Sequence, residues 1–173
     1  MIFVTLGTSD YPFTRLLKQI DDLIENNIVK NITVQCGNKD YQPKNFTIIK
    51  NLDKKEFNEY LKKAEVVITH GGVGTIIDCI KMGKKVIAFP RKVEYGEAKN
   101  NHQEQIINNL KNTGSILTGE INDLAKLLEE VKTLKKIKLK SNNDNFNYQL
   151  CTIIDALSKC DYQSTFFLYN LHM

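Results

Sequence analysis

The sequence predicts an α/β protein with a Rossmann-like, mostly parallel sheet flanked by helices. Short apolar runs alternate with segments that have one apolar helical face, which is the pattern of βαβ units. The runs are almost continuously apolar, as expected for strands covered by helices on both faces. Two runs end in glycine-bearing turns, Gly7-Thr8-Ser9 and His70–Thr75. Because parallel strands end at a common edge, both turns are expected at that edge.

Apolar runs predict the strands, at residues 2–6, 31–37, 46–50, 66–69, 85–90 and 115–118. Apolar residues at helical spacing predict the helices, at residues 12–24, 53–64, 75–83, 103–110 and 122–131, with 148–157 as a further candidate. Pro12 suits the first turn of its helix, and Asp53 with Glu56 has capping-box spacing. Gly83 suits a helix C-terminus, and Asn122 or Asp123 caps the helix that follows it.

Length and composition favour one domain, residues 1–160, followed by an apolar tail at 161–173. The four cysteines form no CxxC pair and have no zinc-ligand spacing, which favours a reducing, cytoplasmic compartment. The first residues lack the pattern of a signal peptide, and no run approaches the roughly 20 apolar residues of a spanning helix. The net charge of +4 is gathered locally at 132–140, so a broad basic face for nucleic acid is not expected.

The turn His70-Gly71-Gly72-Val73-Gly74-Thr75 carries the stronger binding signal. Its glycines allow close approach to a phosphate, and the following helix offers free backbone N–H groups and the positive end of its dipole. Thr75 and His70 add side-chain donors. The spacing matches neither the dinucleotide fingerprint nor the P-loop, so a phosphate site of another kind is expected.

Two further features lie near the same edge. Asp78 lies three residues after Thr75, where a carboxylate can accept hydrogen bonds from ribose hydroxyls. The alternative is a solvent-facing residue that only favours the helix dipole. The polar loop after the fifth predicted strand offers hydrogen-bonding groups for a sugar, namely Glu94, Glu97, Asn101, His102 and Gln103. The alternative there is an ordinary surface loop.

Three stretches of the chain carry a family resemblance when taken together. They are FVTLGTSDYPF, VVITHGGVGTIIDCIKMGKKVIAFPR and NNHQEQ. In combination they resemble the glycosyltransferase family 28 C-terminal domain. The resemblance covers roughly residues 1–135. It is closest to small stand-alone versions, which serve as subunits of bacterial capsule and exopolysaccharide glycosyltransferases and of the eukaryotic dolichol-linked N-acetylglucosamine transferase. It implies the fold of the C-terminal half of a GT-B glycosyltransferase, the half that binds the donor nucleotide.

The resemblance also assigns roles to residues. Gly7 and Thr8 would lie against the nucleotide phosphates, and Asp78 stands where the family usually has a ribose-binding Glu. His102 and Gln103 match an Asn-His-Gln element that reaches the donor sugar or its phosphate, and residues 50–64 resemble the segment whose backbone reads uracil. The turn would hold the pyrophosphate through His70, Gly71, Gly72, Gly74 and Thr75.

The activity implied is transfer of a hexose from a UDP-sugar to a lipid-linked acceptor in capsule or exopolysaccharide synthesis, with β-1,4-linked galactose as the first sugar to test. A membrane-associated partner subunit would bind the acceptor and hold this chain at the inner face of the membrane. Helix dipole and backbone N–H groups would stabilise the departing UDP. The sequence has no D-x-D element, so no metal and no cofactor are expected. The general base is expected on the partner, and His102 is the candidate on this chain.

Three alternatives remain at this point. A non-catalytic activating subunit would share the fold and bind UDP-sugar poorly, which the intact turn argues against. A sugar-nucleotide epimerase would need further catalytic carboxylates and a second domain. A nucleic-acid-binding module would need aromatic residues interleaved with Lys and Arg, which the sequence lacks.

Overall fold

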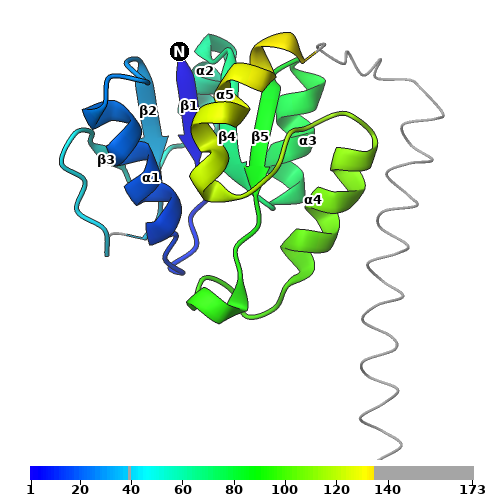
Figure 1. Cartoon of the computed structure of the whole chain (residues 1–173), viewed down its shortest axis with the longest axis horizontal. Coiled ribbons are helices and arrows are strands. Elements are labelled where there is room, and N and C mark those ends of the chain that lie inside the picture. The colour runs from blue at the N-terminus through cyan, green and yellow to red at the C-terminus, as the bar shows by residue number, and fades with distance from the viewer. Residues whose placement is uncertain (39, 135–173) are drawn as a thin grey trace, which may run out of the picture. The chain divides into compact units, whose positions relative to one another are not determined.

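The computed structural model describes residues 1–38 and 40–134 and contains the predicted α/β fold. Its sheet is entirely parallel, with strands in the order β3-β2-β1-β4-β5 (Figure 1). The strands are β1 (Ile2–Thr5), β2 (Ile32–Gln35), β3 (Ile48–Ile49), β4 (Val66–His70) and β5 (Lys85–Phe89). The first strand therefore lies in the middle, as in other doubly wound folds.

Helices join most of these strands. They are α1 (Thr14–Glu25), α2 (Lys54–Lys63), α3 (Val73–Lys81), α4 (His102–Asn112) and α5 (Leu124–Thr133), with 3₁₀ turns η1 (Val93–Tyr95) and η2 (Ile121–Asp123). In Figure 1, α1 and α5 lie in front of the sheet and α2 and α3 behind it. Both faces of the sheet are therefore covered.

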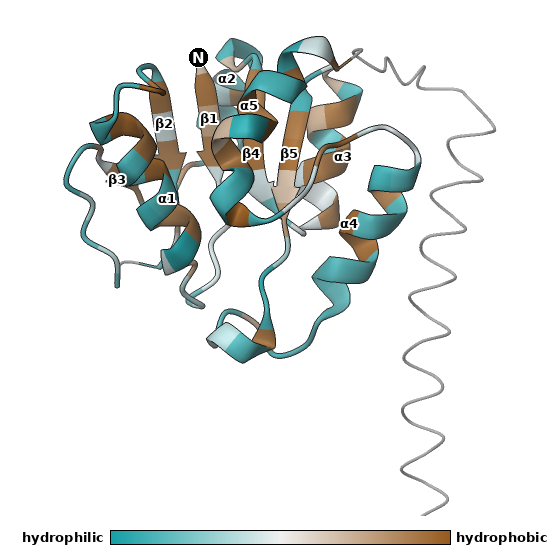
Figure 2. Ribbon diagram, viewed as in Figure 1, coloured by the Kyte–Doolittle hydropathy of each residue, from teal (hydrophilic) through white to brown (hydrophobic). Residues whose placement is uncertain are grey.

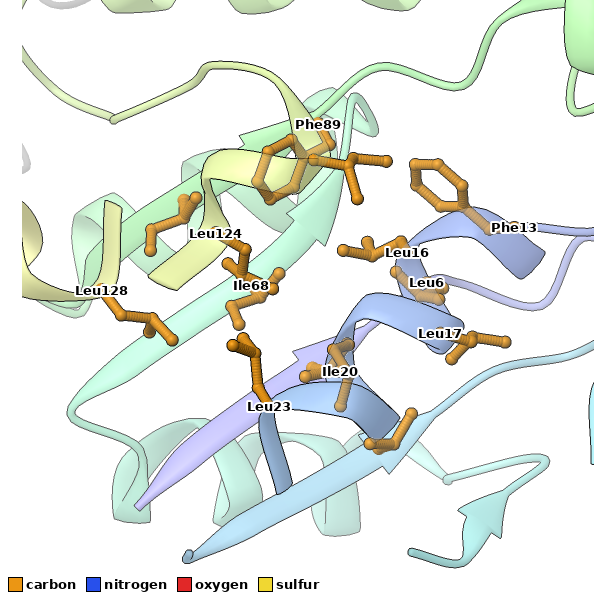
Figure 3. Close-up of a cluster of buried hydrophobic side chains, with 14 of the residues drawn as sticks. Leu6, Phe13, Leu16, Leu17, Ile20, Leu23, Ile68, Phe89, Leu124 and Leu128 are labelled. Carbon is orange, nitrogen blue, oxygen red and sulfur yellow. The ribbon is translucent and has the colours of Figure 1, made fainter. Parts of the chain in front are cut away.

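Successive strand residues point to opposite faces of the sheet and build two apolar layers. Val4, Ile68 and Ile87 belong to the cluster that also contains the buried leucines of α1 and α5 (Figure 3). On the other face, Phe3 packs against Tyr60 and Phe57 of α2, at ring-centroid distances of 5.4 and 5.8 Å. The hydropathy colouring shows the same division, with apolar strands and polar outer helix surfaces (Figure 2).

Two predicted helix signals are confirmed. The Asp53 side chain accepts a hydrogen bond from the Glu56 amide at 2.8 Å, and the Glu56 carboxylate accepts one from the Asp53 amide at 2.9 Å. Gly83 follows the end of α3 with a φ of +65°. Residues with a side chain adopt this left-handed conformation only at a cost, so glycine is favoured there.

The ends of several predicted elements differ in detail from the structure. Pro12 lies before α1, because Phe13 takes the N-cap position and accepts the first backbone hydrogen bonds. The α3 helix begins at Val73, two residues earlier than predicted, because Gly72 adopts the extended N-cap conformation. Asp123 is the N-cap of α5 but makes no side-chain cap hydrogen bond. The predicted strand at 115–118 is reduced to a single parallel bridge between Leu117 and Ile87.

The predicted domain limit at residue 160, the tail at 161–173 and the candidate helix at 148–157 lie outside the described residues. Residues Met1–Lys138 form one compact unit. Within the described part of the chain, every helix is too short or too polar to cross a lipid bilayer.

Candidate functional site

The strand order marks the space beyond the carboxyl ends of β1 and β4, here called the crevice, as the expected position of a ligand. These strands are neighbours, with Thr5 opposite Thr69, yet the chain leaves β1 toward β2 and leaves β4 toward β5 on the other side. At such a switch point the following loops part and leave room for a ligand. Gly7 and Thr8 follow β1, and His70 ends β4 and opens the second turn.

Buried hydroxyl and amide groups fix the first turn. Thr69 Oγ1 donates to the Thr5 carbonyl at 2.9 Å, and Thr5 Oγ1 donates to Gln35 Oε1 at 2.8 Å. Gln35 Nε2 in turn donates to the Gly7 carbonyl at 3.0 Å. Because these groups satisfy one another in the interior, they hold the backbone of Gly7 in one position. Its φ of +73° favours glycine there.

The imidazole of His70 lies between the two turns. A Cβ atom on Gly7 would lie 3.1 Å from His70 Cε1, and one on Gly72 would lie 2.7 Å from His70 Nε2. Side chains at these two positions would collide with the ring, so both glycines make room for it. The structure therefore brings Gly7, His70 and Gly72 together, as the sequence predicts.

His70 is neutral at pH 7. Burial and, to a smaller extent, the positive charge of Arg91 lower the pKa of its imidazole to about 4, although the Thr5 carbonyl opposes the shift. A neutral imidazole carries one N–H donor and one acceptor. His70 Nδ1 is buried without a hydrogen bond of normal geometry.

The first turn of α3 faces the crevice with unpaired donors. The Ile76 amide donates to the Gly72 carbonyl and is the first to bond within the helix. The amides of Val73, Gly74 and Thr75 therefore have no partner within the helix. A Cβ atom on Gly74 would meet no atom within 4 Å, so the backbone is open to a ligand there. Free backbone amides at the N-terminus of a helix are groups that can bind an anion.

Gln103 connects two loops instead of pointing freely toward a ligand. Its Oε1 accepts hydrogen bonds from the amides of Gly71 and Arg91, both at 3.1 Å. A Cβ atom on Gly71 would lie 2.5 Å from Gln103 Cβ, so the contact requires glycine. The oxygen is therefore committed to the protein, and the N–H groups of the Gln103 amide are what it can offer to a ligand.

The remaining predicted site residues lie farther from this cluster or on its rim. Thr8 is exposed, and its backbone packs against Gly37. Asp78 is exposed on α3 and makes no side-chain hydrogen bond or ion pair with the other site residues that the structure describes. His102 is half-buried at the start of α4, where its amide donates to Asn100 Oδ1 at 3.4 Å.

The polar loop contributes less free hydrogen-bonding capacity than the sequence suggests. Glu97 is only 3% exposed, and its carboxylate binds Arg15 and the Lys92 amide. The Asn101 side-chain oxygen accepts from the Val93 amide at 3.2 Å. Of the two carboxylates expected to meet a sugar, only Glu94 is exposed, and it lies 3.6 Å from Lys92.

Sequence reasoning missed Arg91. Its side chain is 2% exposed, and Nη2 donates to the Leu6 carbonyl at 2.9 Å. The guanidinium lies over the Phe13 ring at 5.5 Å, and its Nε has no hydrogen-bond partner. Nothing in the stretch FPRK separates this buried arginine from a solvated one. The only signal is its position directly after a buried strand.

The fold is the α/β fold found in the C-terminal half of GT-B glycosyltransferases. Residues 1–155 match the model of the glycosyltransferase family 28 C-terminal domain, and the chain belongs to that family.

The curated relatives are bacterial transferases. The chain is 32% identical over 124 residues to the UDP-N-acetylglucosamine–N-acetylmuramyl-(pentapeptide) pyrophosphoryl-undecaprenol N-acetylglucosamine transferase of Prochlorococcus marinus subsp. pastoris, over 70% of this chain and 30% of the relative. It is 31% identical over 151 residues to the enzyme of the same name from Prochlorococcus marinus strain MIT 9301, over 83% of this chain and 38% of the relative. The chain thus matches about a third of these relatives' length.

Solved structures agree on the fold. The solution NMR structure of ALG13 superposes with a TM-score of 0.54 at 18% identity, covering 84% of this chain and 92% of ALG13. The glycosyltransferase SnogD from Streptomyces nogalater gives a TM-score of 0.50 at 18% identity, covering 79% of this chain and 34% of SnogD.

Proposed function

We propose that this chain binds a UDP-sugar at the carboxyl ends of β1 and β4 and supplies the donor site of a hexosyltransferase. The observation that carries the proposal is the first turn of α3, whose unpaired amides and unobstructed Gly74 lie at the switch point of the sheet. The relatives with more than 30% identity are named as users of UDP-N-acetylglucosamine, which supports a UDP-sugar as the donor.

In this proposal the protein acts mainly by stabilising charge. Cleavage of the bond between the sugar and UDP leaves negative charge on the departing diphosphate. The amides of Val73, Gly74 and Thr75 and the dipole of α3 are fixed in place before the reaction, so they stabilise that charge without reorganising. Neutral His70 and the Thr75 hydroxyl add donors at the same turn.

Acceptor binding is assigned to a membrane-associated partner subunit that completes the cleft and carries the general base. The described residues support this division, because His102 is the one histidine near the rim of the crevice and shares no described side-chain contact with the turn. The proposed acceptor is a lipid-linked saccharide in capsule or exopolysaccharide synthesis, and galactose is the first hexose to test. The chain would then act in the cytoplasm, against the inner face of the membrane.

Calorimetric titration with UDP, GDP and ADP, followed by UDP-galactose and UDP-N-acetylglucosamine, tests the donor class. We expect saturable UDP binding with Kd between about 1 µM and 1 mM, and GDP and ADP weaker by at least about tenfold. Absence of UDP binding, both alone and with the partner subunit, would contradict the proposal and favour a non-catalytic activating subunit.

Transfer assays test the division of labour. The purified chain alone should show no hexose transfer to a lipid-linked acceptor, and addition of the membrane-associated partner should produce it. Transfer at an ordinary enzymatic rate by the chain alone would overturn the two-subunit part of the proposal.

A further inference from the structure

A buried ion pair joins α1 to the β5–α4 loop (residues 90–101). Arg15 Nε donates to Glu97 Oε1 at 2.7 Å, and Arg15 Nη2 donates to Glu97 Oε2 at 2.9 Å. The Glu97 side chain is 3% exposed and that of Arg15 is 25% exposed. A bidentate pair in this setting is directional and poorly screened by water, so it differs from a surface salt bridge.

The pair also closes the loop on itself. Glu97 Oε2 accepts from the Lys92 amide at 3.1 Å, and the Glu97 amide donates to the Lys92 carbonyl, also at 3.1 Å. Arg15 Nη2 donates to the Pro90 carbonyl at 2.7 Å, at the point where the chain leaves β5. Glu97 therefore fixes both the start and the middle of the loop.

Aromatic rings hold the guanidinium of Arg15 in position. It lies 5.2 Å from the centroid of the Phe13 ring and 4.8 Å from that of Tyr95. Tyr95 belongs to η1 and is 57% exposed, so it covers Arg15 from the solvent side of the loop. These cation–π contacts constrain Arg15 from both sides of the loop junction.

The same loop leads directly into the proposed donor site. Next to Pro90, the Arg91 amide donates to Gln103 Oε1, which also accepts from the Gly71 amide in the phosphate-binding turn. Arg91 Nη2 donates to the Leu6 carbonyl beside Gly7. A chain of hydrogen bonds therefore runs from the ion pair to both turns of the crevice and to the start of α4.

We propose that Arg15 and Glu97 are positioning residues that set the β5–α4 loop and the start of α4 against the donor sugar. This inference rests on the proposed function. Glu97 then acts through the loop and not as a hydrogen-bonding partner of the sugar. The pyrophosphate site on α3 is built from other residues, so the pair governs the sugar-dependent part of donor binding.

The test compares UDP with a UDP-sugar in wild type, Glu97→Gln and Arg15→Lys, using whichever of UDP-galactose and UDP-N-acetylglucosamine the wild type binds more tightly. Glu97→Gln keeps the shape but removes the charge, and Arg15→Lys keeps the charge but removes the bidentate geometry. Glu130→Gln is the matched control, because Glu130 is an exposed carboxylate that pairs with Lys126 on the surface of α5, outside the proposed site.

We expect both variants to weaken UDP-sugar binding by about tenfold while UDP binding changes by less than about threefold, because misplacement of the loop affects the sugar contacts most. Glu130→Gln should match wild type. Thermal unfolding is recorded for every variant. If Glu97→Gln does not fold, Arg15→Lys decides, since its side chain is partly exposed.

Two results would overturn the inference. One is an equal loss of UDP and UDP-sugar affinity that tracks the loss of thermal stability, which indicates a purely structural pair. The other is unchanged binding of both ligands. Failure of the wild type to bind UDP at all would instead contradict the proposed function, so the two failures are distinguishable.

Discussion

At the scale of single residues, the site depends on how His70 is accommodated. The ring fits because Gly7 and Gly72 have no side chains, and it stays neutral because burial and Arg91 disfavour its charged form. A charged imidazole would bind phosphate more strongly in water, but here the N–H groups of α3 already supply positive potential. His70 therefore places a neutral ring of fixed position next to that helix end.

The lowered pKa of His70 predicts a pH dependence of stability. Above pH 6.5 the imidazole is neutral in both the folded and unfolded states. As pH falls from 6.5 toward 4, only the unfolded state takes up the proton, so the free energy of unfolding decreases. Between pH 7 and pH 5 the contribution of His70 to the free energy of unfolding falls by about 2 kcal/mol. Urea unfolding at the two pH values measures this free energy.

The matched variant for this measurement is His70→Asn, which does not titrate. Between pH 7 and pH 5 its free energy of unfolding should fall by about 2 kcal/mol less than that of wild type. The carboxylates are common to both proteins and cancel in the comparison. An identical pH dependence of the two proteins would show that His70 is not the group responsible.

Some of these residues could be predicted and some could not. Glycines after apolar strands predict turns, and the sequence at His70–Thr75 predicts a phosphate site there. The sequence could not show that Gln103 Oε1 and Glu97 are occupied by protein groups, because their partners lie 32 and 82 residues away in the chain. Arg91 was missed for the same reason.

At the scale of elements, the β2–β3 connection is held by one buried carboxylate. Asp21 lies on α1 and is 3% exposed. It accepts hydrogen bonds from the Tyr41 hydroxyl at 2.7 Å and from the amides of Lys44 and Asn45 at 2.8 Å. This parallel crossover has no helix, so Asp21 supplies the fixed point that a helix otherwise gives. Burial and the hydrogen bond to Asp21 raise the pKa of Tyr41 to about 12.

Asp21→Asn should therefore destabilise the protein. The new side chain keeps one oxygen and turns an NH₂ group toward donors, which leaves at least one of them unpaired. We expect a loss of about 2–3 kcal/mol in urea unfolding, together with faster hydrogen exchange at the Lys44 and Asn45 amides. Asp22→Asn, at the exposed neighbouring position, should change neither quantity. Equal effects of the two substitutions would contradict an anchoring role for Asp21.

The elements themselves were largely predictable, since apolar periodicity depends on burial and helices cover the central strands of the sheet on both faces. The exceptions have local causes. SILT has the composition of a strand, but only Leu117 pairs with β5 before Gly119 and η2 redirect the chain. The observed helix starts at Thr14 and Val73 differ from the predicted ones because Phe13 and Gly72 occupy the N-cap positions. Neither makes a side-chain cap hydrogen bond, so the sequence carries no capping signal at these positions.

At the scale of the whole molecule, strand order turns these elements into a site. Local patterns predict strands and helices but do not state which strands are neighbours. With β1 beside β4, two turns separated by more than 60 residues meet at one crevice, and Gly7 contacts His70. The membership of glycosyltransferase family 28 and the superposition on ALG13 agree with this topology.

The measurement that tests the central claim most directly is calorimetric titration of UDP into wild type, Gly74→Asp and Asn109→Asp. Gly74 has open space around it and lies in the first turn of α3, where a carboxylate favours the helix dipole, so the substitution should leave folding intact. Its charge would occupy the proposed diphosphate position and repel the ligand. Asn109→Asp adds the same charge at an exposed position on α4.

The account predicts that Gly74→Asp weakens UDP binding by about 100-fold or more while Asn109→Asp binds as wild type. Wild-type affinity in a folded Gly74→Asp variant would contradict the placement of the donor at this turn.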